Sequence, residues 1–224
     1  ARYVGVDKAS GEYRAPVLAT PALSVGLEPQ GMAWPQGSRE ARQVTVLVRN
    51  ESRTGAAGSV SLEGPDGWNV TPASIPFNMI VEGSNRGFTF TVEPGGDVNS
   101  GAHVFRAVAT LDAGERFDER VDIIDYPHIE RTLYFKPAEM QASVLSVEVA
   151  PVKIGYIMGS GDGGLEALRQ MGADAEEVSV DRVRGGDFSG YDVLVLGIRV
   201  YETRPDVAAA NDQILEFARA GGTV

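Results

Sequence analysis

The fold of this chain is decided by two apolar runs, KIGYIM at residues 153–158 and YDVLVLG at residues 191–197. Neither run alternates strictly between apolar and polar residues, which is typical of strands buried on both faces of a parallel sheet. A glycine-bearing loop, GSGDGG at residues 159–164, follows the first run, and IRVYETR at residues 198–204 follows the second. Each loop leads into a helix-like stretch. We therefore expect a flavodoxin-like, doubly wound α/β sheet over residues 151–224, whose first and third strands flank the ligand-binding switch point.

Six polar side chains in these two loops are candidate ligand-binding residues, because both loops follow strands at the same edge of the expected sheet. Groups of this kind can satisfy sugar hydroxyls. Two plainer interpretations stay open: Asp162 is an ordinary helix N-cap, and residues 199–204 form a self-paired surface loop. The six candidates are Ser160, Asp162, Arg199, Tyr201, Glu202 and Arg204.

The glycine-bearing loop also offers backbone N–H groups that could cradle an anion at a helix start. It lacks the Lys-Ser/Thr ending of a P-loop, and the Asp162 carboxylate would repel a phosphate. The following strand lacks a clean ribose-binding acid, which disfavours a dinucleotide site.

One helix is expected after residue 203. Thr203 and Asp206 have the spacing of a capping box, and Pro205 suits the first turn, where a missing N–H costs nothing. A buried stripe on this helix would consist of Val207, Ala210, Ile214 and Phe217.

Residues 21–125 change to a period of two, as in VTVLV at residues 44–48 and FTFTV at residues 88–92. Turn signals separate roughly seven short strands, the number typical of an immunoglobulin-like sandwich. Trp34 and Trp68 are interpreted as core anchors, with exposed sugar-stacking platforms as the less favoured alternative. Further strands are expected at residues 22–28, 59–63, 103–111 and 116–124.

The remaining segments complete the expected domain order. Residues 1–20 resemble the end of a preceding β-rich segment, and residues 126–150 are too apolar for a disordered linker, so we expect an ordered connector whose last part adds a strand or packs across the junction. The chain begins with Ala1 rather than Met, and residues 221–224 suggest a helix stop and the first residues of a fourth strand. We expect a fragment whose last domain, residues 151–224, is truncated.

Composition excludes several function classes. The formal net charge of -11 without a run of basic residues argues against nucleic-acid binding, and no apolar run approaches the ~18 residues of a membrane span. The chain has no cysteine, and its two histidines, His103 and His128, lie far apart without a metal-ligand spacing. No Gly-x-Ser-x-Gly elbow occurs. We therefore expect no catalytic residue, no bound metal and no cofactor in this chain.

Three runs resemble the C-terminal part of large bacterial PIG-L (LmbE-like) family deacetylases. They are DYPHI with RTLY at residues 125–134, IGYIMGSGD at residues 154–162 and GIRVYETRPD at residues 197–206, the last being the most specific. Within this resemblance, residues 21–125 look like the sandwich associated with NPCBM and alpha-galactosidase proteins. Residues 151–224 look like the start of a class I glutamine amidotransferase-like domain.

The resemblance implies an activity that this chain does not itself carry. The family's zinc site belongs to an N-terminal domain with an Ala-His-Pro-Asp-Asp-like motif, which no stretch here matches, and the cysteine of an amidotransferase is also missing. The expected function is a non-catalytic accessory region of a zinc-dependent N-deacetylase acting on N-acetylated sugars, which binds or positions glycan. The alternative is a structural spacer without a ligand; an active amidohydrolase is the least favoured. The expected partners are the upstream deacetylase domain and carbohydrate, and the expected location is extracytoplasmic.

Overall fold

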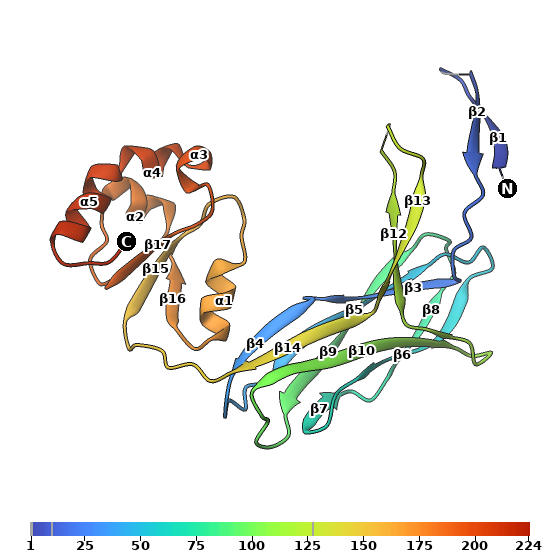
Figure 1. The fold of residues 1–224 in the computed structure, drawn as a ribbon, viewed down its shortest axis with the longest axis horizontal. Helices are drawn as coiled ribbons and strands as arrows, with labels where there is room; N and C mark the ends of the chain where they lie inside the picture. The colour runs from blue at the N-terminus through green and yellow to red at the C-terminus, as the bar shows by residue number, and fades with distance from the viewer. Residues whose placement is uncertain (1, 10, 127) are drawn as a thin grey trace. The chain divides into compact units, whose positions relative to one another are not determined.

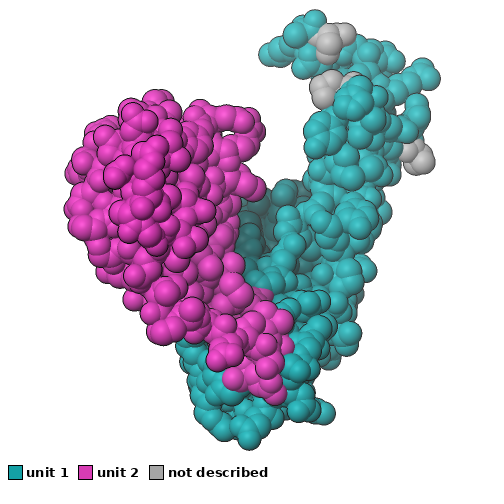
Figure 2. Space-filling model, turned by 60° about the vertical axis from the view of Figure 1, so that its left-hand side comes forward, with its two compact units in different colours: residues 1–31, 37–143 teal, residues 32–36, 144–224 magenta. Residues whose placement is uncertain are grey.

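The computed structural model describes residues 2–9, 11–126 and 128–224. Ala1, Ser10 and Pro127, the last of them within the DYPHI run, lie outside the described residues. The described chain is mostly β, with 48% strand and 14% helix. It divides into two compact units, residues 1–31 with 37–143 and residues 32–36 with 144–224, which Figure 2 colours separately.

Among the described residues, fourteen strands precede residue 146, and the remaining elements follow it (Figure 1). The first group is β1 Arg2–Asp7, β2 Gly11–Pro16, β3 Leu23–Glu28, β4 Gly31–Pro35, β5 Arg42–Asn50, β6 Ala56–Glu63, β7 Trp68–Thr71, β8 Ile75–Met79, β9 Asn85–Pro94, β10 Gly101–Leu111, β11 Arg116–Phe117, β12 Glu119–Ile124, β13 Thr132–Pro137 and β14 Glu139–Leu145. The second group is β15 Lys153–Ile157, α1 Gly164–Gln170, β16 Asp174–Glu177, α2 Val180–Gly185, β17 Val193–Leu196, α3 Val200–Thr203, α4 Pro205–Ala209 and α5 Asn211–Arg219.

Two sheets form a β-sandwich around residues 23–145. One has the order β3-β5-β9-β7, and the other has the order β4-β14-β10-β6-β8 with β11 paired to β10. The period of two decides which side chains are buried: Val44, Val46 and Val48 lie inside, and Val44 and Val46 pair across the ladder with Phe90 and Phe88. The expected alternation is therefore confirmed.

Aromatic side chains join the two sheets of the sandwich. The Trp68 ring on β7 meets the Phe105 ring on β10 edge to face, with ring centroids 5.2 Å apart, and Phe77 on β8 lies 6.1 Å from Phe88 on β9. Trp68 is 9% exposed and Trp34 only 1%. The interpretation of both tryptophans as core residues is confirmed, and the alternative of sugar-stacking platforms is wrong.

The strand expected over residues 116–124 is two strands, because the chain changes partners at Asp118. β11 pairs with β10, whereas β12 pairs with β13 in a separate two-stranded hairpin. This hairpin is tied to the sandwich where Val121 N donates to Ser24 Oγ at 2.9 Å and where Ala107 N of β10 donates to the Ala138 carbonyl at 2.9 Å. A second hairpin, β1 with β2, lies at the N-terminal end (Figure 1).

The second unit holds a three-stranded parallel sheet with the order β16-β15-β17. Side chains of β15 alternate between two apolar clusters: Ile154 and Tyr156 pack with Leu165 of α1, whereas Ile157 packs with residues of α2, α4 and α5, including Ile214. Both faces of the sheet are covered, which explains why the apolar runs do not alternate. Past α5, Thr223 forms a parallel bridge with Val193 of β17, as expected for the first residues of a further strand.

The helix expected after residue 203 differs in detail. Two helices, α4 and α5, share the stripe: Val207, Ala210 and Ile214 are buried, and Phe217 is half-buried. The capping box is wrong, because Thr203 ends α3 and its hydroxyl donates to the Arg199 carbonyl at 3.1 Å. Pro205 does occupy the first turn of α4, as expected.

Candidate functional site

The loops that follow β15 and β17 meet at the carboxyl edge of the parallel sheet, because these strands are neighbours with Ile157 opposite Leu196. Gly197 N donates to the Ile157 carbonyl at 2.9 Å, and Ser160 N donates to the Ile198 carbonyl at 3.0 Å. The expectation that the two loops face each other is met. They do so through direct backbone hydrogen bonds.

Glycines allow this close approach of the two loops. A Cβ atom on Gly159 would lie 2.1 Å from the Ile198 carbonyl oxygen, and one on Gly197 would lie 2.7 Å from the Gly159 nitrogen. Both distances are shorter than any tolerable contact, so only glycine fits. At Gly159 and Gly197 the two loops are in van der Waals contact, which leaves no room for a ligand between these two residues.

Asp162 holds the two loops together with both carboxylate oxygens. Its Oδ1 accepts from the Tyr156 hydroxyl and from Gly164 N at 2.9 Å, and its Oδ2 accepts from Ile198 N at 2.9 Å. The hydrogen bond from Tyr156 and then those from the two backbone N–H groups hold the pKa of Asp162 below its usual range. Burial, and next the bond to Asp162, raises the pKa of Tyr156 to about 12.

The helix N-cap interpretation of Asp162 is close but displaced by one residue. The N-cap position of α1 is Gly163, which makes no side-chain capping bond. Asp162 precedes it and still accepts from Gly164 N in the first turn. Its role in the structure is therefore that of a staple between two loops, with local help to the helix start.

The cluster that follows β17 pairs largely within itself. Arg199 donates twice to Glu202 Oε2, at 2.8 and 2.5 Å, and the Tyr201 hydroxyl donates to Asn211 Oδ1 at 2.8 Å. These side chains are exposed. Arg199 has φ 54°, in the left-handed region that costs a non-glycine residue strain.

Arg204 is the most enclosed basic residue of the cluster. It forms a bidentate ion pair with Asp206, at 2.9 and 2.7 Å, and donates to the Met158 carbonyl at 3.1 Å. The Arg204 and Asp206 side chains are only 19% and 13% exposed. The ion pair raises the pKa of Arg204 and lowers the pKa of Asp206. Arg204 therefore ties the chain after β17 to the end of β15.

The structure thus supports the plainer interpretation for residues 199–204, a self-paired surface loop. Of the six candidates, Asp162, Arg199, Tyr201, Glu202 and Arg204 have side-chain partners within the two loops and the adjoining helices, and Ser160 is exposed. Ligand binding by these six residues stays a prediction. In this geometry a ligand would compete with existing hydrogen bonds.

The two histidines of the chain have different surroundings and no shared metal-ligand cluster among the described residues. Among the described residues, no group of three or more His, Cys, Asp or Glu side chains could hold a metal ion. His103 Nε2 lies 2.8 Å from the Asn99 carbonyl, and its ring packs beside Trp68. His128 is exposed, with its ring 5.9 Å from that of Tyr126.

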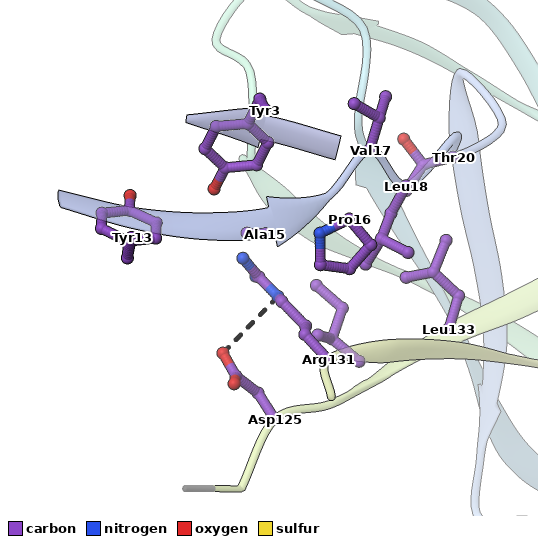
Figure 3. Close-up of a pocket in the computed structure, with 11 residues that line it drawn as sticks. Tyr3, Tyr13, Ala15, Pro16, Val17, Leu18, Thr20, Asp125, Arg131 and Leu133 are labelled. Atoms are coloured by element: carbon purple, nitrogen blue, oxygen red, sulfur yellow. Dashed lines mark ion pairs between the residues drawn. The ribbon is translucent and has the colours of Figure 1, made fainter. Parts of the chain in front are cut away.

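A second polar site lies between the two hairpins of the first unit, in a pocket of about 550 Å³ (Figure 3). Tyr3, Tyr13 and Ala15 line it from β1 and β2, and the β12–β13 hairpin contributes a second wall. That wall consists of Ile123, Asp125, Arg131 and Leu133, and the segment with Pro16, Val17, Leu18 and Thr20 completes the lining.

Strand register explains why these residues share the pocket. Tyr3 pairs with Ala15 and Gly5 with Tyr13, so all four side-chain positions lie on one face of the first hairpin. Ile123 pairs with Leu133 in the second hairpin, on the face that continues into Asp125 and Arg131. Each hairpin therefore turns one face toward the pocket.

Sequence reasoning missed this pocket. Its residues come from positions 3–20 and 123–133, more than 100 residues apart, and no local motif joins them. The available signal was the alternation of each hairpin, which predicts that Tyr3 and Tyr13 can share a face. It cannot predict which other hairpin lies opposite.

Comparisons with known proteins identify part of the chain. Residues 36–112 match the family described as the NPCBM-associated, NEW3 domain of alpha-galactosidase. The matched residues span β5 to β10 of the sandwich. No curated protein matches the chain.

Three solved structures are similar to part of this chain. A mutant of Salmonella alpha-2-macroglobulin has 14% sequence identity and a TM-score of 0.37, over 60% of this chain and 7% of that one. Alpha-2-macroglobulin from E. coli has 13% identity and a TM-score of 0.35, over the same shares. A FixG-related protein from Vibrio parahaemolyticus has 9% identity and a TM-score of 0.35, over 56% of this chain and 98% of its own.

Proposed function

We propose that this chain is a non-catalytic, carbohydrate-related accessory module that binds or positions glycan for a catalytic domain of the same protein. One observation carries the proposal: a NEW3-type domain, associated by name with alpha-galactosidase, occupies residues 36–112 of a β-sandwich. The pairing pattern in the second unit is compatible with it, because those polar groups stabilise loops and are not gathered around a reaction centre.

The finer proposal concerns the parent protein and the fold families. We propose that the catalytic domain is a PIG-L-type zinc-dependent N-deacetylase acting on N-acetylated sugars, and that the protein works outside the cytoplasm. The sandwich would be immunoglobulin-like, and residues 151–224 would be a flavodoxin-like, amidotransferase-related domain without the nucleophile, since the chain has no cysteine. The support is the sequence resemblance of residues 197–206 and its neighbouring runs.

Glycan titration tests the accessory function directly. The isotope-labelled chain is titrated to millimolar concentration with melibiose, N,N′-diacetylchitobiose and soluble peptidoglycan fragments, and amide NMR shifts are followed. The proposal expects saturable shifts in a contiguous group of residues for at least one sugar. An unchanged spectrum with every sugar would overturn glycan binding by this chain.

A structural spacer is the second candidate, favoured by the internal pairing of Asp162, Arg199 and Arg204. A spacer requires a stable fold but no ligand. The two functions are distinguished by replacing this chain, within the parent enzyme, with an unrelated rigid domain. A spacer predicts that the replacement retains activity on polymeric substrate. A glycan-binding module predicts that the replacement lowers activity on polymer and leaves activity on a small soluble substrate unchanged.

A further inference from the structure

We propose that the pocket between the β1–β2 and β12–β13 hairpins is a binding site for one or two sugar units of an uncharged glycan. The inference deepens the proposed function and rests on it, because it names the site and the ligand class. The pocket volume of about 550 Å³ lies within the ~300–1,000 Å³ typical of small-molecule sites. Figure 3 shows aromatic and polar side chains converging on it.

The lining has the mixture of groups that a pyranose requires. Apolar surface comes from Ala15, Ile123 and Leu133, which can contact the C–H faces of a sugar ring. The tyrosines supply aromatic faces and hydroxyl groups that donate and accept hydrogen bonds. Their rings lie edge to face with centroids 6.1 Å apart, and Tyr3 and Tyr13 are 45% and 44% exposed.

The charged groups of the lining favour an uncharged ligand. Asp125 and Arg131 are the charged residues among those that line the pocket, and they form an ion pair at 3.5 Å, so their formal charges cancel. An anion would meet Asp125 and a cation would meet Arg131, each at a cost. A sugar hydroxyl can donate to the carboxylate and accept from the guanidinium at once.

The geometry of that ion pair leaves the Asp125 carboxylate and the Arg131 guanidinium able to form hydrogen bonds with a ligand. Its 3.5 Å separation is longer than the ~2.7–2.9 Å of a charge-assisted hydrogen bond. Both side chains are about half exposed. In the loops that follow β15 and β17, by contrast, Gly164 N and Ile198 N donate hydrogen bonds to Asp162 at the ordinary length of 2.9 Å.

Two contacts arrange the pocket before any ligand arrives. Arg2 on β1 forms an ion pair with Glu130 at 2.8 Å, which joins the first hairpin to the loop of the second. The Tyr13 ring lies across Gly5, where a Cβ would be 2.5 Å from Tyr13 Cζ. The hydrogen bond with Tyr3 raises the pKa of Tyr13.

Other described cavities lack this combination. A pocket of about 260 Å³ beside Ser24 and Arg120 has no aromatic lining residue. A pocket of about 330 Å³ in the second unit is lined by Phe188 and Phe217, and the Tyr191 hydroxyl there already contacts Arg182. The inter-hairpin pocket combines aromatic faces with a solvent-accessible donor and acceptor pair.

The test combines NMR titration of the whole chain with three variants that change the pocket in different ways. Melibiose and N,N′-diacetylchitobiose are the neutral probes, and galacturonic acid is the anionic counterpart. Tyr13→Ala removes a wall, Arg131→Ala removes the donor, and Gly5→Ala displaces the Tyr13 ring without deleting it. Tyr134→Ala is the matched control, because Tyr134 is an exposed tyrosine on the opposite face of the second hairpin.

The expected result is that a neutral sugar shifts the amides of Ala15 and Leu133, and that Kd rises about tenfold or more in the three pocket variants. Tyr134→Ala leaves Kd unchanged. If a sugar binds but the pocket variants bind it as wild type does, the pocket is wrong while the accessory function stands. If no sugar binds, both fail, and tighter binding of galacturonic acid would overturn the uncharged ligand class.

Discussion

The loops after β15 and β17 and the pocket between the two hairpins are both rich in polar side chains, but they use them differently. Both carboxylate oxygens of Asp162 already accept hydrogen bonds, Oδ1 from the Tyr156 hydroxyl and Gly164 N and Oδ2 from Ile198 N. Asp125 and Arg131 form an ion pair at 3.5 Å, with both side chains about half exposed, in a pocket that Tyr3 and Tyr13 also line. The first region is closed on itself, and the second presents its groups to solvent.

This difference shows that density of polar residues is a poor sign of a binding site when their partners are unknown. The run at residues 197–206 has the most conspicuous polar cluster in the sequence, yet its side chains pair with one another and with neighbouring elements of the fold. A buried or paired polar group contributes to the fold, and a ligand would have to replace its hydrogen bonds. Substitutions can therefore separate polar groups that stabilise the fold from polar groups that are available to a ligand.

The largest effect is expected for Gly159→Ala. The new Cβ would lie 2.1 Å from the backbone oxygen of Ile198, which cannot move without separating the loops. We expect a loss of roughly 3 kcal/mol in the free energy of unfolding of the second unit, measured by urea denaturation. Gly163→Ala is the matched control, since nothing lies within 4 Å of its Cβ position. Equal stability of the two variants would show that the loops do not meet as described.

Arg204→Ala is expected to be the next most disruptive change. It leaves Asp206, which is 13% exposed, without its bidentate partner and frees the Met158 carbonyl. The expected loss is about 1–3 kcal/mol in the free energy of unfolding. Arg219→Ala is the control, because its pair with Glu216 is about 70% exposed and should be worth little. A loss of unfolding free energy no larger than that of the control would mean that the contacts of Arg204 with Asp206 and the Met158 carbonyl do not stabilise the fold.

Tyr156→Phe tests the hydrogen bond from Tyr156 to Asp162 through the pH dependence of the unfolding free energy. Because the folded pKa of Tyr156 is about 12 against an ordinary value of about 10, its contribution to stability is complete below pH ~10 and is lost as the pH rises toward 12. The variant should lose about 1 kcal/mol at neutral pH and show a shallower alkaline decline. An unchanged alkaline limb in pH-dependent thermal unfolding would contradict the assignment.

Asp162→Asn tests the acceptor of the same hydrogen bonds, the Asp162 carboxylate. The pKa of Asp162 is lowered in the folded state, so its contribution is present above the unfolded carboxyl pKa of ~3.9 and is lost as the pH falls through the folded value. Asparagine also places an amide N–H against the Ile198 N–H in one orientation. We expect lower stability at neutral pH and a shallower acid limb than wild type, with glycan affinity unchanged.

The smallest effect is expected for Arg199→Ala and Glu202→Ala. Their ion pair is 68% and 62% exposed, so each variant should change the free energy of unfolding by less than about 0.5 kcal/mol. Arg199→Gly should be at least as stable as wild type, because glycine accepts φ 54° without strain. A loss of glycan binding in Arg199→Ala or Glu202→Ala would instead place the binding site in the loops after β15 and β17 and contradict the comparison.

Much of the architecture follows from local patterns in the sequence. The alternation of residues 44–48 and 88–92 predicted which side chains of β5 and β9 face the core, and the unbroken apolar runs at β15 and β17 predicted strands covered on both faces. These inferences work because a strand has a fixed period of two, and burial on one or both faces leaves a direct mark on composition. The burial of Trp34 and Trp68 was predicted instead from the tendency of tryptophans beside the turns of a sandwich to belong to the core.

Other features depended on partners that are remote in the sequence. The break between β11 and β12 arises because the chain leaves β10 for β13, and the pocket walls come from hairpins more than 100 residues apart. Whether Asp162 would cap a helix, bind a ligand or staple two loops depended on the position of Ile198 N, 36 residues later. The sequence alone determined strand periodicity, core faces and the absence of a nucleophilic cysteine. The tertiary structure decided which polar groups are already satisfied, because a hydrogen bond depends on distances that local sequence does not set.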